Sequence, residues 1–143
     1  MHADRIIIGN RIEELRRMTH WLTDSASAAG MAKDLVMKLD VCANEAVMNI
    51  ISYAFADSAP HEIVLDLTVI SGGARLVIRD GGVPFNPLQL PEHTTPASLE
   101  DAEIGGLGVH LIRRLMARCD YQRDGGENVL CLEARQDPHP ANA

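Results

Sequence analysis

The sequence predicts an α+β fold, a two-layer sandwich in which helices cover one face of a mostly antiparallel sheet. Three observations lead to this prediction: strand-like segments lie in adjacent pairs joined by glycines, two long segments have helical periodicity, and hydrophobic residues make up 46% of the 143 residues. Strands joined by short turns are antiparallel neighbours, and separate helices must bury their apolar sides against the sheet. We expect one domain over residues 1–135 and a flexible C-terminal tail over residues 136–143.

The N-terminal half contains one predicted strand and two predicted helices. The segment Arg5–Gly9 is short and rich in isoleucine, which favours a strand. Asn10 with Glu13 three residues later predicts a capping box, beginning a helix that ends near Gly30. A second helix is expected over residues 32–54, with no glycine or proline to interrupt it. Its apolar stripe consists of Leu35, Val36, Leu39, Ala43, Ala46, Val47 and Ile50.

The C-terminal half contains two predicted hairpins, separated by an irregular segment and a helix. Residues 80–108 hold four prolines and no sustained periodicity, and an irregular stretch of this length in a small domain is typical of a functional loop. Helical spacing resumes over residues 107–117. The predicted strands cover residues 63–70, 75–79, 121–123 and 128–134, joined in pairs through Ser71–Gly73 and Gly125-Gly126.

Charge and composition exclude several classes of function. The net charge of −7 argues against binding to nucleic acid or to an anionic membrane surface. The longest apolar runs are far shorter than the ~20 residues that a membrane-spanning helix needs. Three cysteines (Cys42, Cys119 and Cys131) have neither disulfide nor zinc-site spacing, and are expected to be reduced core residues. We therefore expect a cytoplasmic protein with no membrane or direct nucleic-acid partner.

Glu45 and Asn49 are the first candidate functional pair. They lie four residues apart on the second predicted helix, so their side chains share one face. Apolar neighbours surround them, which makes these polar groups conspicuous. A carboxylate beside an amide oxygen could act as a base and as a hard oxygen ligand in magnesium phosphate chemistry. The spacing alone is more typical of a solvated pair on an exposed helix face.

Two glycine-containing segments are the other candidates. Asp80-Gly81-Gly82 ends a predicted strand, where a carboxylate and bare backbone could approach a flat ligand, although the same residues also make ordinary turns. Gly105–Gly108 leads into the predicted helix over residues 107–117, and backbone N–H groups at a helix N-terminus bind phosphate. This segment matches neither the Walker motif nor the dinucleotide fingerprint, so alone it is weak evidence.

The order of these three segments resembles the GHKL ATPase superfamily, which includes gyrase, histidine kinases and MutL. Asn44–Asn49, the segment DGGVPFNP at residues 80–87 and the segment GGLGVHLIRRLM at residues 105–116 are similar to the bacterial anti-sigma factor serine/threonine kinases. The resemblance extends over nearly all of residues 6–134. It implies the ATP-binding Bergerat fold, with ATP and Mg²⁺ as cofactors.

The resemblance also implies roles for individual residues. Glu45 would be the general base, and Asn49 would give its side-chain oxygen to Mg²⁺. Asp80 would accept a hydrogen bond from the adenine amino group, and Gly82 would let the base pack against the backbone.

The glycine-rich segment would hold the phosphates through Gly106, Leu107 and Gly108 with the following helix start. Residues 86–104 would form a lid over ATP. The chain departs from the family pattern at Tyr53, where histidine is common, at the Ala54-Phe55 pair that follows it, and at Ile104, where arginine is common.

The family resemblance implies a regulatory kinase that phosphorylates a STAS-type antagonist protein, binds a sigma factor or another regulator in a partner switch, and forms a homodimer. Two alternatives stay open. In one, the chain is a non-catalytic, ATP-dependent interaction module; in the other, it is a stand-alone histidine-kinase-like ATPase domain. The second lacks support from a long dimerising helix hairpin ahead of the domain.

Overall fold

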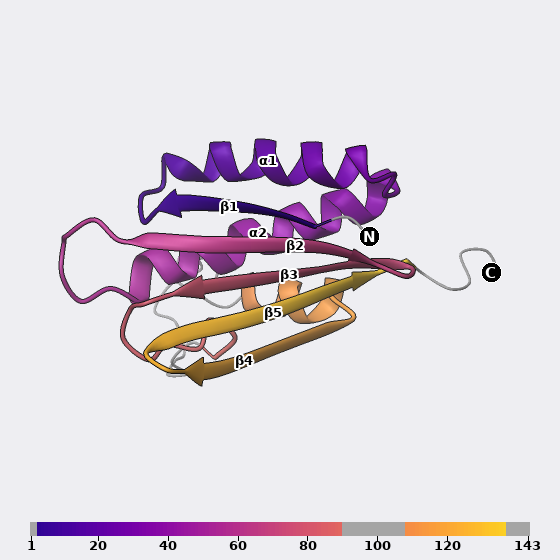
Figure 1. Cartoon of the computed structure of the whole chain (residues 1–143). Helices are drawn as coiled ribbons and strands as arrows, with labels where there is room; N and C mark the ends of the chain where they lie inside the picture. Colours follow the sequence, from indigo (N-terminus) through magenta and orange to yellow (C-terminus); the bar gives the residue numbers. More distant parts are fainter. Residues whose placement is uncertain (1–2, 90–107, 137–143) are drawn as a thin grey trace, which may run out of the picture.

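The computed structural model describes residues 3–89 and 108–136, and a single antiparallel sheet dominates them. Its five strands have the order β1-β2-β3-β5-β4, and every neighbouring pair is antiparallel. Figure 1 shows the strands side by side in this order. Their bounds are β1 (Ala3–Gly9), β2 (Glu62–Ile70), β3 (Gly73–Asp80), β4 (Arg118–Asp124) and β5 (Glu127–Arg135).

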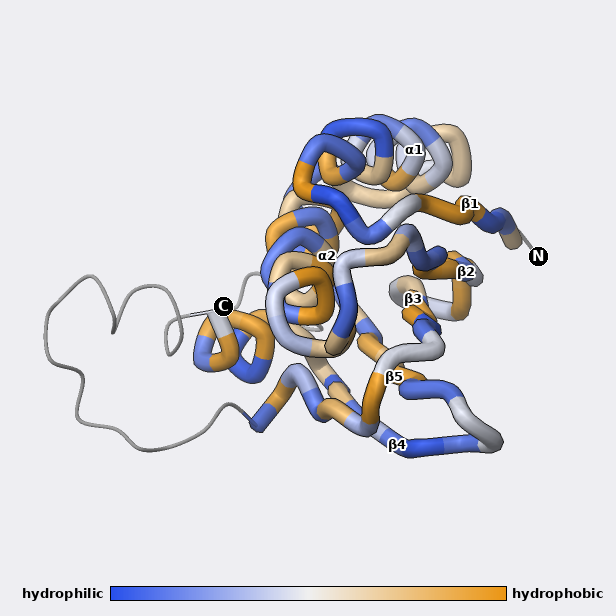
Figure 2. The backbone as a smooth tube through the Cα atoms, turned by 90° about the vertical axis from the view of Figure 1, so that its left-hand side faces the viewer, coloured by the Kyte–Doolittle hydropathy of each residue, from blue (hydrophilic) through white to orange (hydrophobic). Residues whose placement is uncertain are grey.

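The helices cover one face of the sheet. They are α1 (Glu14–Ala28), α2 (Lys33–Tyr53) and a helix over residues 108–115. Figure 2 shows all of them on the same side, with α1 nearest to β1. The predicted two-layer α+β sandwich is therefore confirmed.

The hydrophobic core lies between the inner face of the sheet and the two long helices. Residues alternate along β2, where Ile63, Leu65 and Leu67 are buried and the residues between them are more exposed, as expected for a strand with one covered face. The predicted stripe of α2 is confirmed, because all seven of its apolar residues are buried. The only tryptophan, Trp21 of α1, is half-buried and packs against this core.

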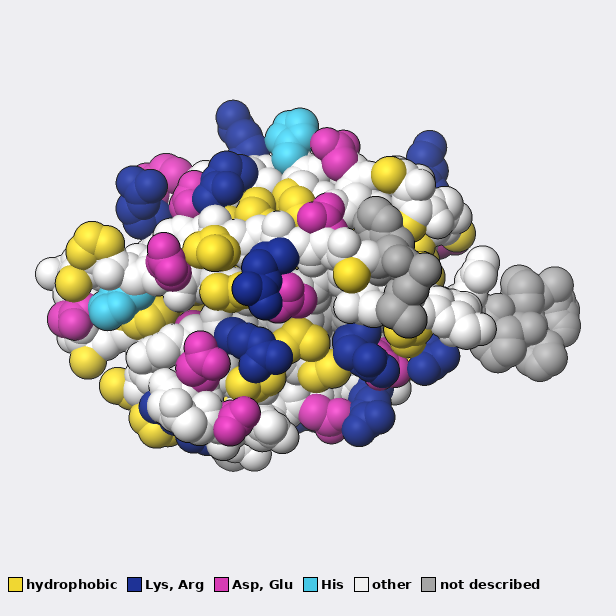
Figure 3. Space-filling view, in the orientation of Figure 1, with side chains coloured by type: hydrophobic (Ala, Val, Ile, Leu, Met, Phe, Trp, Pro, Cys, Tyr) yellow, Lys and Arg dark blue, Asp and Glu magenta, His cyan; other side chains and the backbone are white. Residues whose placement is uncertain are grey.

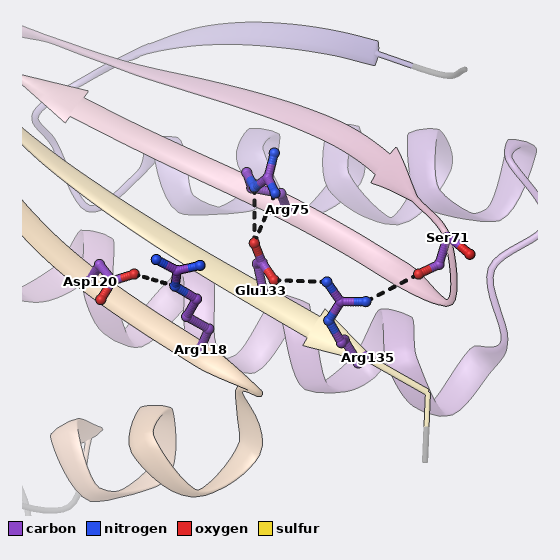
Figure 4. Close-up of polar contacts among 6 residues, drawn as sticks. All are labelled: Ser71, Arg75, Arg118, Asp120, Glu133 and Arg135. Carbon is purple, nitrogen blue, oxygen red and sulfur yellow. Dashed lines mark hydrogen bonds and ion pairs between the residues drawn. The ribbon is translucent and has the colours of Figure 1, made fainter. Parts of the chain in front are cut away.

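The opposite face of the sheet carries charged side chains interspersed with apolar ones (Figure 3). Close to the C-terminal end of β5, Glu133 accepts hydrogen bonds from Arg75, at 2.9 and 3.1 Å, and from Arg135, at 3.2 Å (Figure 4). Arg118 pairs with Asp120 on the neighbouring strand β4 at 2.6 Å. Glu133 is only 4% exposed, so these arginines cover a buried carboxylate.

The predicted capping box at Asn10 is wrong. Helix α1 begins at Glu14, and the residue before it, Glu13, makes no side-chain cap. The Asn10 side chain instead accepts a hydrogen bond from the His61 backbone N–H at 2.9 Å. Asn10 therefore joins the β1–α1 connection to the segment before β2, and the first backbone donors of α1, Glu14 N–H and Leu15 N–H, bond to backbone oxygens of residues 11 and 12 instead.

Other boundaries differ by a few residues. Strand β4 begins at Arg118, three residues before the predicted start at residue 121, because it pairs with β5 along its full length. Helix α1 ends as predicted near Gly30, whose φ of 83° only glycine adopts easily. No helix in the described ranges is long and apolar enough to cross a membrane. All of the predicted tail except its first residue, Gln136, lies outside those ranges.

Candidate nucleotide-binding site

Helix α2 and the start of the helix over residues 108–115 bring Glu45 and Gly108 together. A Cβ atom added to Gly108 would lie 2.4 Å from Glu45 Oε1, so any side chain here would displace the carboxylate. Gly108 is the first described residue of its helix. The predicted base and the last glycine of the predicted phosphate segment thus lie in contact.

Asn49 lies one turn further along α2. Its side chain is buried, with 6% of the residue exposed, and its Nδ2 atom finds no hydrogen-bond partner among the described residues. A buried amide group without a partner is costly, so such groups are rare unless a ligand or ion completes them.

Asp80 ends strand β3 and is 2% exposed. Its Oδ1 atom accepts hydrogen bonds from the Gly82 backbone N–H at 2.8 Å and from Asn128 Nδ2 at 2.9 Å. Its Oδ2 atom is buried and has no partner within the part of the chain that the structure describes. Burial raises the pKa of the Asp80 carboxyl, and the two hydrogen bonds oppose that rise.

Gly82 lies against the C-terminal end of α2. A Cβ atom here would lie 2.2 Å from the Ala54 carbonyl oxygen, and that same oxygen accepts a hydrogen bond from the Val83 N–H at 2.8 Å. The absence of a side chain therefore allows the turn after β3 to reach the helix that carries Asn49. Tyr53, one of the departures from the family pattern, is 47% exposed at the end of α2, and its ring contacts Phe85 at 5.7 Å between centroids.

The structure places Glu45, Asn49, Asp80, Gly82 and Gly108 on the segments that surround the C-terminal half of α2. Gly106 and Leu107 lie outside the described residues, as do Ile104 and most of the predicted lid. Of the lid, residues 86–89 are described, and they form a turn in which Asn86 Oδ1 accepts from the Leu88 N–H at 2.8 Å. Leu88 is buried, and its carbonyl oxygen accepts a hydrogen bond from Arg113 at 3.1 Å.

Sequence reasoning missed Asn128 as a candidate site residue. It is 2% exposed on β5 and contacts Asp80 directly. A signal was present, because Asn128 occupies the same strand face as the buried Leu130 and Leu132. Asparagine is disfavoured within strands, so an asparagine at an apolar position of a strand indicates a specific polar partner.

Comparison with known proteins supports the resemblance. Residues 8–134 match the family model described as the histidine kinase-like ATPase domain. The serine/threonine-protein kinase BtrW of Bordetella bronchiseptica is 35% identical over 119 residues, which cover 83% of this chain and 84% of that protein. The serine-protein kinase RsbW of Bacillus pumilus is 25% identical over 114 residues, covering 76% of this chain and 70% of that protein.

Solved structures show the same fold at low sequence identity. The crystal structure of the RsbU and RsbW domains of a Mycobacterium tuberculosis protein superposes with a TM-score of 0.68 at 14% identity, covering 94% of this chain and 32% of that one. A blue-light activated histidine kinase of Erythrobacter litoralis gives a TM-score of 0.54 at 17% identity, covering 90% of this chain and 42% of that one. This chain thus spans less than half of either solved chain.

Proposed function

This chain belongs to the histidine kinase-like ATPase family, and from that premise we propose that it is an ATP-dependent serine/threonine-protein kinase. The observation that carries the proposal is a pair of unsatisfied buried polar atoms, Asp80 Oδ2 and Asn49 Nδ2, on two segments that Gly82 holds together. Relatives that match most of this chain are named as serine/threonine or serine kinases. Serine or threonine transfer is therefore favoured over histidine phosphorylation.

The residues present fit ATP with magnesium. A buried carboxylate oxygen without a donor is suited to the exocyclic amino group of adenine, and Asp80 Oδ2 is such an atom. An amide side chain can present either its oxygen or its nitrogen, so Asn49 could offer an oxygen to Mg²⁺. Magnesium is commonly held by one or two protein groups together with substrate phosphates, and the described residues contain no cluster of three or more His, Cys, Asp or Glu side chains that could hold a metal alone.

Each remaining group has a role in positioning or proton transfer. Glu45 would accept the proton of the attacking serine or threonine hydroxyl. Gly106, Leu107 and Gly108 would offer backbone N–H groups to the phosphates. When bound, ATP supplies the phosphoryl group and Mg²⁺ neutralises its charge, so the protein contributes mainly positioning and electrostatics.

We further propose that the substrate is a STAS-domain antagonist, and that the chain alternates between this protein and a sigma factor or another regulator. The support is the similarity to RsbW-type proteins in sequence and fold. A cytoplasmic location and a homodimer belong to the same proposal. Residues 1–135 would act as one kinase domain.

A phosphotransfer assay tests the proposal. The purified chain is incubated with γ-labelled ATP and a candidate STAS-domain protein, and the label is traced to the modified residue. We expect label on serine or threonine. In Glu45→Gln, transfer should fall by about two orders of magnitude or more, while ATP affinity stays within a few-fold, because only the base is lost.

The same assay separates the alternatives. ATP binding without any transfer, and with Glu45→Gln indistinguishable from the wild type in partner binding, would indicate a non-catalytic interaction module. Acid-labile label on a histidine would indicate a histidine-kinase-like domain.

A further inference from the structure

The two outer strands of the sheet, β1 and β4, differ in how their outward backbone groups are satisfied (Figure 1). On β1, side chains of the chain itself occupy the outward groups of three residues. The Gly9 N–H donates to Glu14 at 2.7 Å, the Ile7 carbonyl accepts from Arg17 at 2.8 Å, and the Arg5 N–H donates to Asp4 at 2.9 Å. Backbone groups that are already bonded cannot pair with another strand, so β1 is closed to strand addition.

Strand β4 has an open edge instead. The Gly125-Gly126 connection has positive φ at both glycines, 57° and 86°, which makes a type I′ turn with Asp124 and Glu127 as its hydrogen-bonded pair. Hydrogen-bonded and non-hydrogen-bonded pairs alternate along an antiparallel ladder, so the backbone N–H and C=O groups of residues 119, 121 and 123 point away from β5. No backbone hydrogen bond from another segment in the described part of the chain reaches these groups.

The side chains of β4 make this edge complementary to itself. Arg118 and Asp124 stand at opposite ends of the strand, on the face that also carries Asp120 and Gln122. When two copies of β4 pair antiparallel about Tyr121, Arg118 of each copy lies opposite Asp124 of the other, and Asp120 lies opposite Gln122. Residues 119, 121 and 123 then meet across the interface, so every outward backbone group has a partner. Opposite charges that face each other on paired strands stabilise the pair.

Other arrangements of the same two strands bring like charges together. A shift of the pairing by two residues in one direction places Asp120 opposite Asp120 of the other copy, and the reverse shift places it opposite Asp124. A parallel arrangement in register places every charge opposite its own copy. Like charges directly opposite destabilise a strand pair, so the charges of β4 favour one register and one orientation.

The strand is already arranged for this pairing in the single chain. On its inner face, Tyr121 and Arg123 both hydrogen-bond to the buried Asn128, which holds β4 in place before a partner arrives. On its outer face, Arg118 pairs with Asp120 at 2.6 Å, and their side chains are 66% and 54% exposed (Figure 4). An ion pair this exposed contributes little to stability, so Arg118 can turn to a carboxylate of another copy at small cost.

We propose that β4 pairs antiparallel with β4 of a second copy of this chain, joining the two sheets into one continuous sheet. The contact is isologous, with its two-fold axis beside Tyr121 and perpendicular to the sheet, so the helices of both copies lie on the same side. This inference rests on the proposed function, because it gives the homodimer proposed there its contact surface.

Sedimentation equilibrium of the full chain without nucleotide, over a wide range of concentrations, tests the proposal by charge reversal. The wild type should form a dimer. Arg118→Glu and Asp124→Arg each place like charges opposite each other twice in the dimer, so each should raise the dimer dissociation constant by about tenfold or more. The double variant restores opposite charges and should return the constant to within about threefold of the wild type. The matched control is Lys33→Glu, an exposed charge reversal at the start of α2, which should leave the constant unchanged.

Two outcomes of sedimentation would overturn the proposal. One is a wild type that stays monomeric at every concentration. The other is a dimer whose dissociation constant the single charge reversals do not change, or which the folded double variant does not recover.

Amide hydrogen exchange of the wild type, followed by NMR, tests the same contact without any substitution. The amides of Cys119, Tyr121 and Arg123 should exchange more slowly as the protein concentration rises, because pairing covers them. The Ile7 amide, on the opposite edge of the sheet, should exchange at a constant rate. Exchange at residues 119, 121 and 123 that does not depend on concentration, in a protein that dimerises, would overturn the proposal.

These measurements are independent of phosphotransfer, so the proposals can fail separately. A monomer that phosphorylates its substrate would remove the homodimer and this interface and leave the kinase activity in place. A dimer with unprotected β4 amides would keep the homodimer and remove only this interface. A dimer paired through β4 that transfers no phosphate would keep the interface and remove the kinase activity.

Discussion

At the scale of single residues, the candidate site combines burial with incomplete hydrogen bonding. Asp80 is 2% exposed, yet one of its oxygens has no donor among the described residues. Such a group destabilises the empty protein, because burial penalises its charged form. Ligand-binding residues often lower the stability of the protein without its ligand. Replacing such a residue should therefore weaken ligand binding without lowering the free energy of unfolding.

Replacing Asp80 with asparagine should therefore abolish ATP binding without destabilising the fold at neutral pH. The pKa of Asp80 is raised in the folded state, so the native state holds its proton more tightly than the unfolded state does. The Asp80 carboxyl therefore stabilises the folded wild type below the ordinary aspartate pKa. This stabilisation is lost as the pH rises through the raised pKa of the folded state.

The free energy of unfolding of Asp80→Asn, relative to that of the wild type, should consequently increase between the ordinary aspartate pKa and the raised pKa of Asp80. Above the raised pKa the difference should stay constant. Thermal unfolding of both proteins without nucleotide, from pH 4 to pH 8, measures this difference. A variant that is less stable than the wild type at pH 7 would show that the carboxylate is stabilised by contacts beyond those described.

Gly82 and Gly81 provide a matched pair of substitutions. Gly82→Ala would place a methyl group 2.2 Å from the Ala54 carbonyl, a backbone atom that cannot move aside alone, whereas Gly81→Ala meets nothing within 4 Å. We expect Gly82→Ala to cost about 1–3 kcal/mol in urea unfolding and to weaken ATP binding at least tenfold. Gly81→Ala should have little effect on either quantity, and similar losses in both variants would contradict the close packing as the cause.

The sequence alone identifies those candidate site residues that are recognisable from local spacing or composition. Glu45 and Asn49 share a helix face because they are four residues apart, and Asp80 with Gly82 marks the end of a strand by composition alone. Asn128 lies 48 residues from Asp80, and their contact depends on the register between β3 and β5. The pairing of strands that are distant in the chain is a tertiary property, and local sequence patterns do not reveal it.

At the scale of elements, a polar cluster links the two long helices on the side away from the candidate site. Asn44 Nδ2 donates to Asp40 Oδ1 and to Thr19 Oγ1, both at 3.0 Å, and Thr19 donates to Asp40 Oδ1 at 2.9 Å. Asn44 and Asn49 differ by about 140° around α2, so the two asparagines face different neighbours. Asn44 belongs to the packing of α1 on α2, although it lies within the segment that resembles the family motif.

Asn44→Ala should therefore lower the free energy of unfolding by about 1–2 kcal/mol and leave ATP affinity and phosphotransfer near the wild-type values. Urea unfolding and the phosphotransfer assay described above measure both quantities. The reverse result, weaker ATP binding with unchanged stability, would place Asn44 in the nucleotide site.

Element types were predictable from periodicity, but some element ends were not. The α2 stripe and the alternation of β2 are strong local patterns, and both are confirmed. The capping box at Asn10 failed because its side chain bonds to the backbone of His61, which is remote in the sequence. Strand β4 has few buried residues, so only its pairing with β5 determines its start at Arg118.

At the scale of the whole molecule, the two faces of the sheet have different chemistry. Apolar packing holds the helices on one face, and the other face carries the arginine–carboxylate group around Glu133 (Figures 3 and 4). Hydrogen bonds from Arg75, and then from Arg135, lower the pKa of Glu133. This interaction joins β3 to β5 on the side of the sheet opposite the described helices.

Glu133→Gln should reduce the free energy of unfolding by about 1 kcal/mol at pH 7. Because the folded-state pKa of Glu133 lies below its ordinary value of 4.5, its contribution is present above that pH and is lost as pH falls through the lowered value. The difference between variant and wild type should therefore shrink in acid, and also in 1 M NaCl, because Arg75 and Arg135 are themselves exposed and salt screens their charges. Urea unfolding at pH 7 and at a pH well below 4.5, each in dilute buffer and in 1 M NaCl, tests this. A difference independent of pH and salt would show that packing, rather than charge, is responsible.

The position of Trp21 gives the molecule a built-in optical reporter. It is the only indole in the chain, it lies on α1 against the core, and none of the candidate site residues is on that helix. Its emission should shift to longer wavelength when α1 leaves the core, since the ring then meets water. Saturating ATP should hardly change the emission of the folded protein. Tryptophan fluorescence can thus follow folding in every variant above, independently of nucleotide occupancy.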